Sequence, residues 1–297
     1  MRFIDPHHHL WNLGKNLYPW LADVNHDRGW GDWSALRQNY LVEDFLQDAR
    51  PHTLLKSVHV QANFDPRNPV GETAWLDSVA AAAGSRGFPQ GIVAFVDLSR
   101  NDAEAVIEAH KVSPRLRGIR QVLNRHPDPR LNRAPVDFLA NPTWQANFSL
   151  LRKHDLSFDA QIYYQQMPSL AALARRHPDT QFVLDHFGMP AERDAAGLEG
   201  WRAGMRGLAQ APNIAVKLSG FGMVDLHWTV DSIRPFVRET IALFGSNRCM
   251  FASNFPVDKL MRDYDRLWQA YAATVIDLSP EEQQQLFIST AERIYRI

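Results

Sequence analysis

The sequence predicts an α/β protein that folds as a single (β/α)8 (TIM) barrel, and three observations support this. Short apolar runs recur at a spacing of roughly 30 residues, which is typical of repeated strand–helix units. Eight such runs are present, and eight strands that alternate with helices favour a closed barrel over an open sheet. No internal repeat, low-complexity tract or linker-like run interrupts the pattern. We therefore expect residues 1–297 to form one barrel domain.

The predicted strands are the apolar runs, and most of them end in polar residues. They cover residues 3–9, 57–62, 92–98, 116–122, 156–163, 182–187, 214–219 and 249–255. The segments between them carry apolar residues three and four positions apart, which is the helical period. Predicted helices cover residues 73–83, 102–110 with Asp102 as N-cap, 142–154, 167–177, 232–244 and, with Pro280 in the first turn, 279 to about 295.

Residues 18–38 form a long segment that is rich in Trp and has little periodicity. A long loop that follows a strand is usually functional in a compact domain. We expect this loop insertion to be a lid or wall over the mouth of the barrel, or a contact between two copies of the chain in a homodimer.

Composition narrows the classes of partner. The 297 residues are 45% hydrophobic and 22% charged, with a formal net charge of −1, so nothing favours nucleic acid or a membrane surface. We expect a small-molecule substrate instead. The N-terminus lacks the apolar core of a signal peptide, and no stretch approaches the ~18 apolar residues of a membrane span. With Cys249 as the single cysteine, these features favour the cytoplasm.

The first predicted strand ends in a His-x-His pair. A period of two places His7 and His9 on one face of a strand and His8 on the other. Imidazole is the commonest metal ligand and a frequent general acid or base, so the pair could hold a metal or an anionic substrate. The alternative is a histidine tag or a chance cluster. A tag is usually longer, however, and is not set between apolar strand residues and an aromatic residue.

The other predicted strands also end in polar residues, and active sites of such barrels lie at the C-terminal ends of the strands. These residues are His59, Gln61, Arg120, Asp159, Gln161, Tyr163, His186, Lys217, Ser219 and Asn254. Taken singly, a buried His is often a core residue and a buried Arg is often an ion-pair partner. Because unpaired buried polar groups are costly, one shared polar cavity explains the whole set more economically.

Six motifs in chain order carry a family resemblance. They are Asp5-Pro6-His7-His8-His9-Leu10-Trp11, Val60-Gln61-Ala62, Gly118-Ile119-Arg120, Asp185-His186-Phe187-Gly188-Met189-Pro190, Lys217-Leu218-Ser219-Gly220 and Phe251-Ala252-Ser253-Asn254-Phe255-Pro256-Val257. Together they resemble the amidohydrolase superfamily, in particular the amidohydrolase-related (amidohydrolase 2) branch. That branch includes sugar lactonases and 2-pyrone-4,6-dicarboxylate lactonase.

The resemblance implies that His7, His9 and His186 form the metal or substrate centre. It also implies an aspartate at the end of the eighth strand as metal ligand and general base, and Asn254 stands in that place. An amide cannot accept a proton near neutral pH and offers a cation only a neutral oxygen. Zinc prefers His, Cys and carboxylate ligands. We therefore expect a divalent metal such as zinc to be weakly bound or absent.

Another general base is then needed. Asp258 follows the eighth predicted strand and could swing over the mouth, or it could cap a helix or form a surface ion pair. His59 and Asp159 are the other candidates. By strict alternation Asp185, next to an inward His186, should face away from the barrel axis.

The expected function is that of a hydrolase that opens a small acidic or sugar-derived lactone. Arg120 and Lys217 are the expected anion hooks, because guanidinium and ammonium groups bind carboxylates or a developing oxyanion. The expected catalytic residues are His7, His9, His186, Lys217, Asn254 and Asp258, and the expected substrate-binding residues are Trp11, His59, Gln61, Arg120, Asp159, Gln161 and Tyr163. A metal-dependent decarboxylase of a sister branch and a catalytically silent barrel that binds an organic acid are the alternatives.

Overall fold

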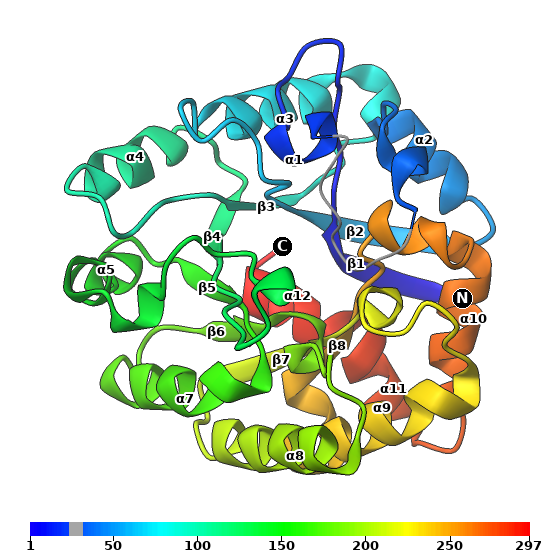
Figure 1. Cartoon of the computed structure of the whole chain (residues 1–297). Coiled ribbons are helices and arrows are strands. Elements are labelled where there is room, and N and C mark those ends of the chain that lie inside the picture. Colours follow the sequence, from blue (N-terminus) through cyan, green and yellow to red (C-terminus); the bar gives the residue numbers. More distant parts are fainter. Residues whose placement is uncertain (24–31) are drawn as a thin grey trace.

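The protein is a closed eight-stranded barrel. The computed structural model describes residues 1–23 and 32–297. Eight parallel strands follow one another in chain order around one sheet, and helices surround them (Figure 1). The strands are β1 Arg2–His8, β2 Thr53–Val60, β3 Gly91–Ala94, β4 Leu116–Val122, β5 Ser157–Gln161, β6 Phe182–Leu184, β7 Ile214–Leu218 and β8 Cys249–Phe251. The predicted (β/α)8 barrel is confirmed.

The helices of the described residues include all six that the sequence predicts. They are α1 Pro19–Ala22, α2 Val42–Asp48, α3 Gly71–Ala81, α4 Ala103–His110, α5 Pro142–Asn147, α6 Ser149–Lys153, α7 Met167–Arg176, α8 Ala195–Ala209, α9 Val230–Phe244, α10 Tyr264–Thr274, α11 Pro280–Gln284 and α12 Thr290–Tyr295. The helix expected over 142–154 is divided into α5 and α6, and the π-helical segment Gln285–Ser289 joins α11 to α12. The helices α1, α2, α8 and α10 were not predicted from the sequence. None of the described helices has the length and apolar character needed to span a membrane.

The seam between β8 and β1 closes the barrel beside the candidate site. The backbone N–H of His9 donates to the Phe255 carbonyl at 2.7 Å, and that of Asn254 donates to the His7 carbonyl at 2.8 Å. Residues on either side of the closure therefore belong to the His-x-His motif and to the motif that contains Asn254.

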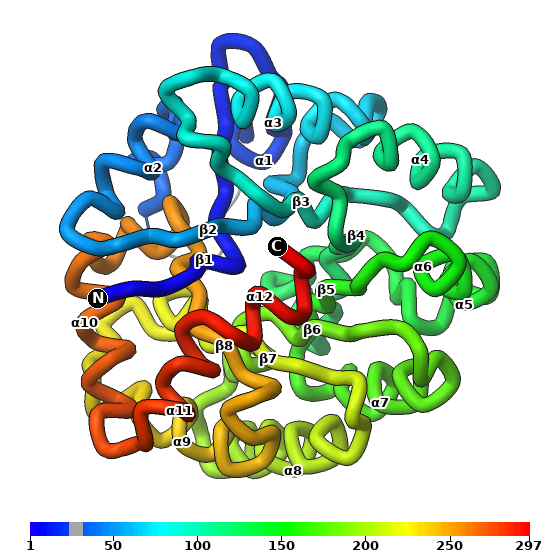
Figure 2. The backbone as a smooth tube through the Cα atoms, turned by 180° about the vertical axis from the view of Figure 1, so that it is seen from behind, coloured from blue at the N-terminus to red at the C-terminus, as the bar shows by residue number. Residues whose placement is uncertain are grey.

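The interior of the barrel is filled by a small apolar cluster with α12 at its base. The cluster consists of Ile4, Val58, Val60, Val93, Val183, Ala215 and Met250 from the strands and Ala291, Ile294 and Tyr295 from the C-terminal end. Seen from behind, the C-terminal helix lies across the centre of the barrel (Figure 2). The C-terminal segment therefore closes the floor, at the end opposite the mouth.

A bulge in β1 determines which of its histidines face the interior. Asp5 pairs with Ser57 and His8 pairs with His59, so β1 advances three residues where β2 advances two. Since Ile4 already faces the inner cluster, simple alternation would turn His8 inward. The extra residue turns His7 and His9 inward instead. His8 stacks on Phe45 of α2 with ring centroids 4.0 Å apart.

Left-handed backbone at the ends of β6 and β8 sets the direction of two more side chains. His186 has φ of 54° within the 3-10 turn Asp185–Gly188, and Asn254 has φ of 56°. This conformation is uncommon for residues other than glycine, and it breaks the alternation of a strand. Asp185 and His186 therefore both face inward. The expectation that Asp185 faces away from the axis is wrong.

The Trp-rich segment forms part of the wall beside the mouth. The Nε1–H of Trp20 donates to the Ala62 carbonyl at 2.7 Å, and its ring stacks on that of Trp33 with centroids 5.9 Å apart. Residues 24–31, the middle of the predicted loop insertion, lie outside the described residues.

Candidate active site at the mouth of the barrel

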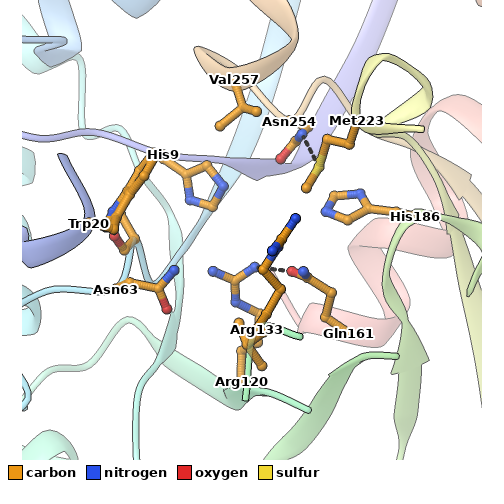
Figure 3. Close-up of a pocket in the computed structure, with 12 residues that line it drawn as sticks. His9, Trp20, Asn63, Arg120, Arg133, Gln161, His186, Met223, Asn254 and Val257 are labelled. Atoms are coloured by element: carbon orange, nitrogen blue, oxygen red, sulfur yellow. Dashed lines mark hydrogen bonds between the residues drawn. The ribbon is translucent and has the colours of Figure 1, made fainter. Parts of the chain in front are cut away.

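A cavity of about 220 Å³ opens at the C-terminal ends of the strands (Figure 3). Five residues predicted from the sequence line it, namely His9, Arg120, Gln161, His186 and Asn254. Sequence reasoning missed seven others, which are Trp20, Ala62, Asn63, Val122, Arg133, Met223 and Val257. Most of the missed residues lie on loops beyond the strand ends, where strand periodicity gives no direction.

The three predicted histidines lie together. The ring centroid of His7 is 5.0 Å from that of His9 and 4.7 Å from that of His186. Burial lowers the pKa of His7 and of His9 well below the usual 6.5, and it lowers the pKa of His186 to about 4. All three rings are therefore neutral near pH 7 and are able to accept a proton.

Hydrogen bonds to the Nδ1 atoms fix the directions of the two rings that line the cavity. His9 Nδ1 lies 2.7 Å from the carbonyl oxygen of Val60. Because a carbonyl can only accept, His9 carries its hydrogen on Nδ1 and has a free electron pair on Nε2. His186 Nδ1 lies 2.9 Å from the Ser219 hydroxyl, which can either donate or accept. His9 is therefore the ring whose basic nitrogen the structure defines.

Lys217 lies in a buried ionic cluster beside His7. Its Nζ is 2.6 Å from Asp159 Oδ2, 3.3 Å from Asp185 Oδ1 and 3.3 Å from His7 Nδ1. Burial acts to raise the Asp185 pKa, but Lys217 and His7 outweigh it and hold that pKa well below its ordinary value. Burial raises the pKa of Asp159 to about 6 despite Lys217. Lys217 does not line the cavity, so the predicted anion hook instead neutralises two carboxylates next to His7.

Arg120 supplies the buried positive charge of the cavity. Its Nη1 donates to Gln161 Oε1 at 3.1 Å, and its Nη2 donates to the backbone carbonyl of Gln61. Asp185 Oδ2 lies 3.9 Å from Nη1. Gln161 in turn donates to Asn124 at 3.0 Å. This network holds one guanidinium in a fixed position at the cavity wall, where a planar anion or a polarised carbonyl can meet it.

A second guanidinium, that of Arg133, lines the same cavity from the loop after β4 (Figure 3). Its Nη1 donates to the backbone carbonyls of Arg130 at 2.8 Å and Asn132 at 3.2 Å. Arg133 was not predicted from the sequence because it lies well beyond the predicted end of the strand. Two cations therefore border one small polar space.

Strand β2 does not place its polar side chains at the site. Val58 and Val60 face the inner cluster, so by alternation His59 and Gln61 face outward. His59 Nε2 lies 3.3 Å from Glu72 of α3, and Gln61 Oε1 accepts from the backbone of Asn63 at 2.7 Å. The structure therefore places these two predicted substrate-binding side chains away from the cavity, because the valines of β2 are the residues that face inward.

Three more predicted substrate-binding residues lie away from the cavity. Trp11 is fully buried and donates to the Gln38 carbonyl at 2.7 Å. Tyr163 donates to the Leu131 carbonyl at 2.9 Å, and Asp159 lies in the ionic cluster around Lys217. None of the three lines the cavity, and Trp20 occupies its aromatic wall.

Asn254 and Asp258 form a buried pair at the end of β8. Asn254 lines the cavity, and its Nδ2 donates to Asp258 Oδ2 at 2.7 Å. Asp258 Oδ1 accepts the backbone N–H of Gly222 at 3.0 Å. Burial raises the Asp258 pKa to about 7. Asp258 therefore lies behind Asn254 and not over the mouth.

The residues at the mouth do not fit a zinc site. Among residues 1–23 and 32–297, no group of three or more His, Cys, Asp or Glu side chains is arranged to hold a metal ion. His7 Nε2 is buried without a hydrogen-bond partner, but the nearest carboxylate, that of Asp185, is paired with Lys217. Asn254 contributes an amide. The ligands facing the cavity are therefore neutral, whereas zinc sites commonly include a thiolate or carboxylate or a full set of converging imidazoles.

The fold and this cavity define a (β/α)8-barrel enzyme with histidine and arginine side chains at the mouth. The Amidohydrolase family model matches residues 4–297, and the chain belongs to that family. The chain is 46% identical over 297 residues to a protein of Sinorhizobium fredii named "Uncharacterized protein y4mH", covering 99% of this chain and 98% of that one.

Two further relatives have more informative descriptions. An L-fucono-1,5-lactonase of Burkholderia ambifaria is 29% identical over 301 residues, which cover 99% of this chain and 95% of the lactonase. The crystal structure of an amidohydrolase from Burkholderia multivorans with bound zinc has a TM-score of 0.81 and 27% identity, with all of both chains covered.

Proposed function

We propose that this enzyme hydrolyses a small lactone to the corresponding hydroxy acid. The observation that carries the proposal is the presence of a neutral, oriented histidine and a buried arginine in the same cavity. The similarity to an L-fucono-1,5-lactonase supports the same chemistry. Hydrolysis of a lactone needs a base for water and a positive group for the oxyanion, and these two residue types provide both.

His9 is the proposed general base. Its Nε2 accepts a proton from water as the water oxygen attacks the lactone carbonyl, and Arg120 stabilises the negative charge that develops on the carbonyl oxygen. The protonated His9 then gives this proton to the ring oxygen when the carbon–oxygen bond breaks, which yields the hydroxy acid and restores the neutral ring. His186 is proposed to donate a hydrogen bond to the ring oxygen and so to stabilise the negative charge that develops there. The buried ionic cluster of His7, Lys217 and Asp185 supports the site and does not contact the substrate.

The cavity favours a substrate with an acidic or a polyhydroxyl character. Arg120 and Arg133 can bind a carboxylate, and Asn63, Gln161 and Asn254 can exchange hydrogen bonds with hydroxyl groups. A sugar-derived lactone and an acidic lactone both meet this description. The relative effect of Arg120 and Arg133 on the two kinds of substrate distinguishes them.

The enzyme is proposed to work with less than one tightly bound zinc per chain. Its relative from Burkholderia multivorans binds zinc, but in this chain Asn254 turns its amide nitrogen toward Asp258, and the Asp185 carboxylate beside His7 is paired with Lys217. Elemental analysis of the purified protein tests this. Stoichiometric zinc that survives dialysis against a chelator would show that the histidines suffice.

A panel of sugar lactones and acidic lactones, assayed with and without chelator, tests the proposed function. We expect hydrolysis of at least one class, unchanged by the chelator and lost in His9→Ala. If no lactone is opened while an organic acid binds with a defined stoichiometry, the protein is a binding barrel. The cytoplasmic location and the homodimer expected from the sequence stay predictions.

A further inference from the structure

We propose that Asp258 is a positioning residue that holds the Asn254 amide with its oxygen toward the cavity, so that Asn254 accepts a hydrogen bond from the attacking water. This inference rests on the proposed hydrolysis. It assigns Asp258 a task different from that of a general base, and it gives Asn254 a task that an amide can perform.

The contacts around Asp258 determine which end of the Asn254 amide faces it. Both side chains are 1% exposed, and Asn254 Nδ2 lies 2.7 Å from Asp258 Oδ2. Asp258 Oδ1 accepts the Gly222 N–H at 3.0 Å, so each carboxylate oxygen has a donor. Asp258 thus acts as an acceptor at both oxygens, and the amide presents its nitrogen to it. The remaining end of the amide is the oxygen.

The oxygen of Asn254 is directed into the cavity. Figure 3 shows it on the side away from Met223, pointing toward the space between His9 and His186. The backbone of Asn254 is fixed by its left-handed φ of 56° and by its N–H bond to the His7 carbonyl. No described residue donates a hydrogen bond to this side-chain oxygen. It is thus free to accept one from a molecule in the cavity.

Two acceptors in one cavity orient a water for attack. Water can donate one hydrogen to Asn254 Oδ1 and the other to His9 Nε2, whose electron pair is free because Nδ1 bonds to Val60. Both electron pairs of the water oxygen then stay available for the lactone carbonyl. If the amide were turned over, its N–H would bind one of these electron pairs and weaken the nucleophile.

An amide at position 254 is also compatible with the carboxyl group that is buried beside it at position 258. Two carboxylates 2.7 Å apart could not both be ionised, whereas an amide and a carboxylate form a charge-assisted hydrogen bond. Gly222 contributes space, since a Cβ at that position would lie 2.7 Å from Asp258 Oδ1. The loop after β7 and the loop after β8 thus meet at Asp258.

Two variants test the orientation. Asp258→Asn can accept from Gly222 and donate to Asn254 Oδ1, which turns the Asn254 N–H into the cavity. We expect kcat to fall roughly 10- to 100-fold with little change in KM. The exchange Asn254→Asp/Asp258→Asn restores an acceptor oxygen toward the cavity, and we expect it to recover most of the lost kcat in the presence of chelator. Asp194→Asn, at the exposed N-cap of α8, is the control that keeps normal activity.

Zinc provides a readout that needs no lactone. In the exchange variant a carboxylate oxygen joins the three histidines, so zinc should raise its melting temperature, whereas zinc should leave Asp258→Asn unchanged. Any one of three outcomes would overturn the positioning role of Asp258. These are full kcat in Asp258→Asn, no recovery of kcat in the exchange variant, and no zinc response of the exchange variant. Failure of the wild-type enzyme on every lactone, with the zinc response intact, would reject the hydrolysis alone.

Discussion

Burial makes the histidines of this site neutral bases. Water is largely excluded from His7, His9 and His186, and their pKa values lie below the ordinary value because the charged imidazolium is poorly solvated there. The cationic groups Lys217 and Arg120 act in the same direction. The rings are therefore unprotonated near pH 7, and a proton taken up by one of them during the reaction is readily given up again.

Arg120 should contribute chiefly to kcat. Because the oxyanion that it stabilises forms only in the transition state, Arg120→Ala should lower kcat far more than it raises KM. Loss of such a buried charged contact corresponds to on the order of 2 to 5 kcal/mol. His186→Ala should also mainly lower kcat. Steady-state kinetics, with folding checked by circular dichroism, measure both effects.

The exposed Arg67→Ala is a suitable control for the loss of a positive charge, because Arg67 pairs only with the nearby Asp65. It should leave both kinetic constants unchanged. Full turnover in both Arg120→Ala and His186→Ala would contradict both proposed roles and favour a binding barrel.

The Asp258 carboxyl should make stability depend on pH. Burial raises its pKa from 3.8 to about 7, so the folded state holds the proton to higher pH than the unfolded state does. Its stabilising contribution is complete below pH 3.8 and is lost as the pH rises to about 7. Asp258→Asn lacks this dependence. The stability of this variant relative to wild type should therefore be greater at pH 8 than at pH 5, as measured by urea unfolding at each pH.

The same comparison with Asp194→Asn provides the reference. Asp194 caps α8 by accepting from Gly197 at 2.7 Å, and it lies on the surface. Asp194→Asn thus shows how a surface substitution of the same kind affects the unfolding curve at each pH. For Asp258→Asn, a difference from wild type that is the same at pH 5 and pH 8 would mean that its carboxyl keeps its ordinary pKa in the folded state.

At the level of single elements, the positions of the strands were predictable from the sequence, but the direction of some of their side chains was not. Apolar runs placed all eight strands, and His9, Arg120, Gln161, His186 and Asn254 were correctly expected at the cavity. The errors have a common physical origin. Alternation gives two faces but does not say which face is inward, and β2 has its valines inside. The bulge in β1 and the left-handed turn after β6 then changed which side chains face inward.

Helix α8 escaped prediction because it contains four glycines, at positions 197, 200, 204 and 207. Glycine weakens an isolated helix, so the sequence alone argues against one here. Two of the glycines permit close packing. A Cβ at Gly204 would lie 2.4 Å from Met167 Sδ and 3.1 Å from Met167 Cβ, and one at Gly200 would lie 2.4 Å from the Tyr164 ring.

Substitutions in α8 should therefore differ in sign. Gly204→Ala should destabilise the protein by about 1 to 3 kcal/mol, because the added methyl group collides with buried Met167. Gly207→Ala meets no atom within 4 Å and should stabilise the protein by about 0.5 to 1 kcal/mol through helix propensity. Urea unfolding measures both. Equal effects of the two substitutions would show that α7 and α8 do not pack this closely.

At the level of the whole molecule, the floor and the mouth of the barrel are connected through one buried tyrosine. Tyr295 of α12 is fully buried, and its hydroxyl donates to Asp159 Oδ2 at 2.8 Å. The same oxygen accepts from Lys217, whose Nζ lies 5.2 Å from the centroid of the Tyr295 ring. The C-terminal helix thus contacts the ionic cluster that lies next to His7.

Removing this hydroxyl should cost more than removing a comparable one elsewhere. Tyr295→Phe leaves the Asp159 carboxyl without one of its donors, and we expect a loss of about 1.5 to 3 kcal/mol. Tyr271→Phe is the matched control, since that buried hydroxyl donates to the neutral Ala252 carbonyl at 3.2 Å and should contribute about 0.5 to 1.5 kcal/mol. Chemical unfolding compares them. A smaller loss for Tyr295→Phe would argue against the charged bond.

The seam between β1 and β8 has a consequence for how the protein matures. His7 and His9 lie near one end of the chain and Asn254 near the other, so this group of side chains comes together only when the first and the eighth strands meet. Pairing of segments so distant in sequence is intrinsically slow, because the chain must lose much of its entropy before the contact forms. A partly folded chain therefore carries no assembled cavity. Because the cavity needs both strands in place, catalysis can appear only after β1 and β8 have paired.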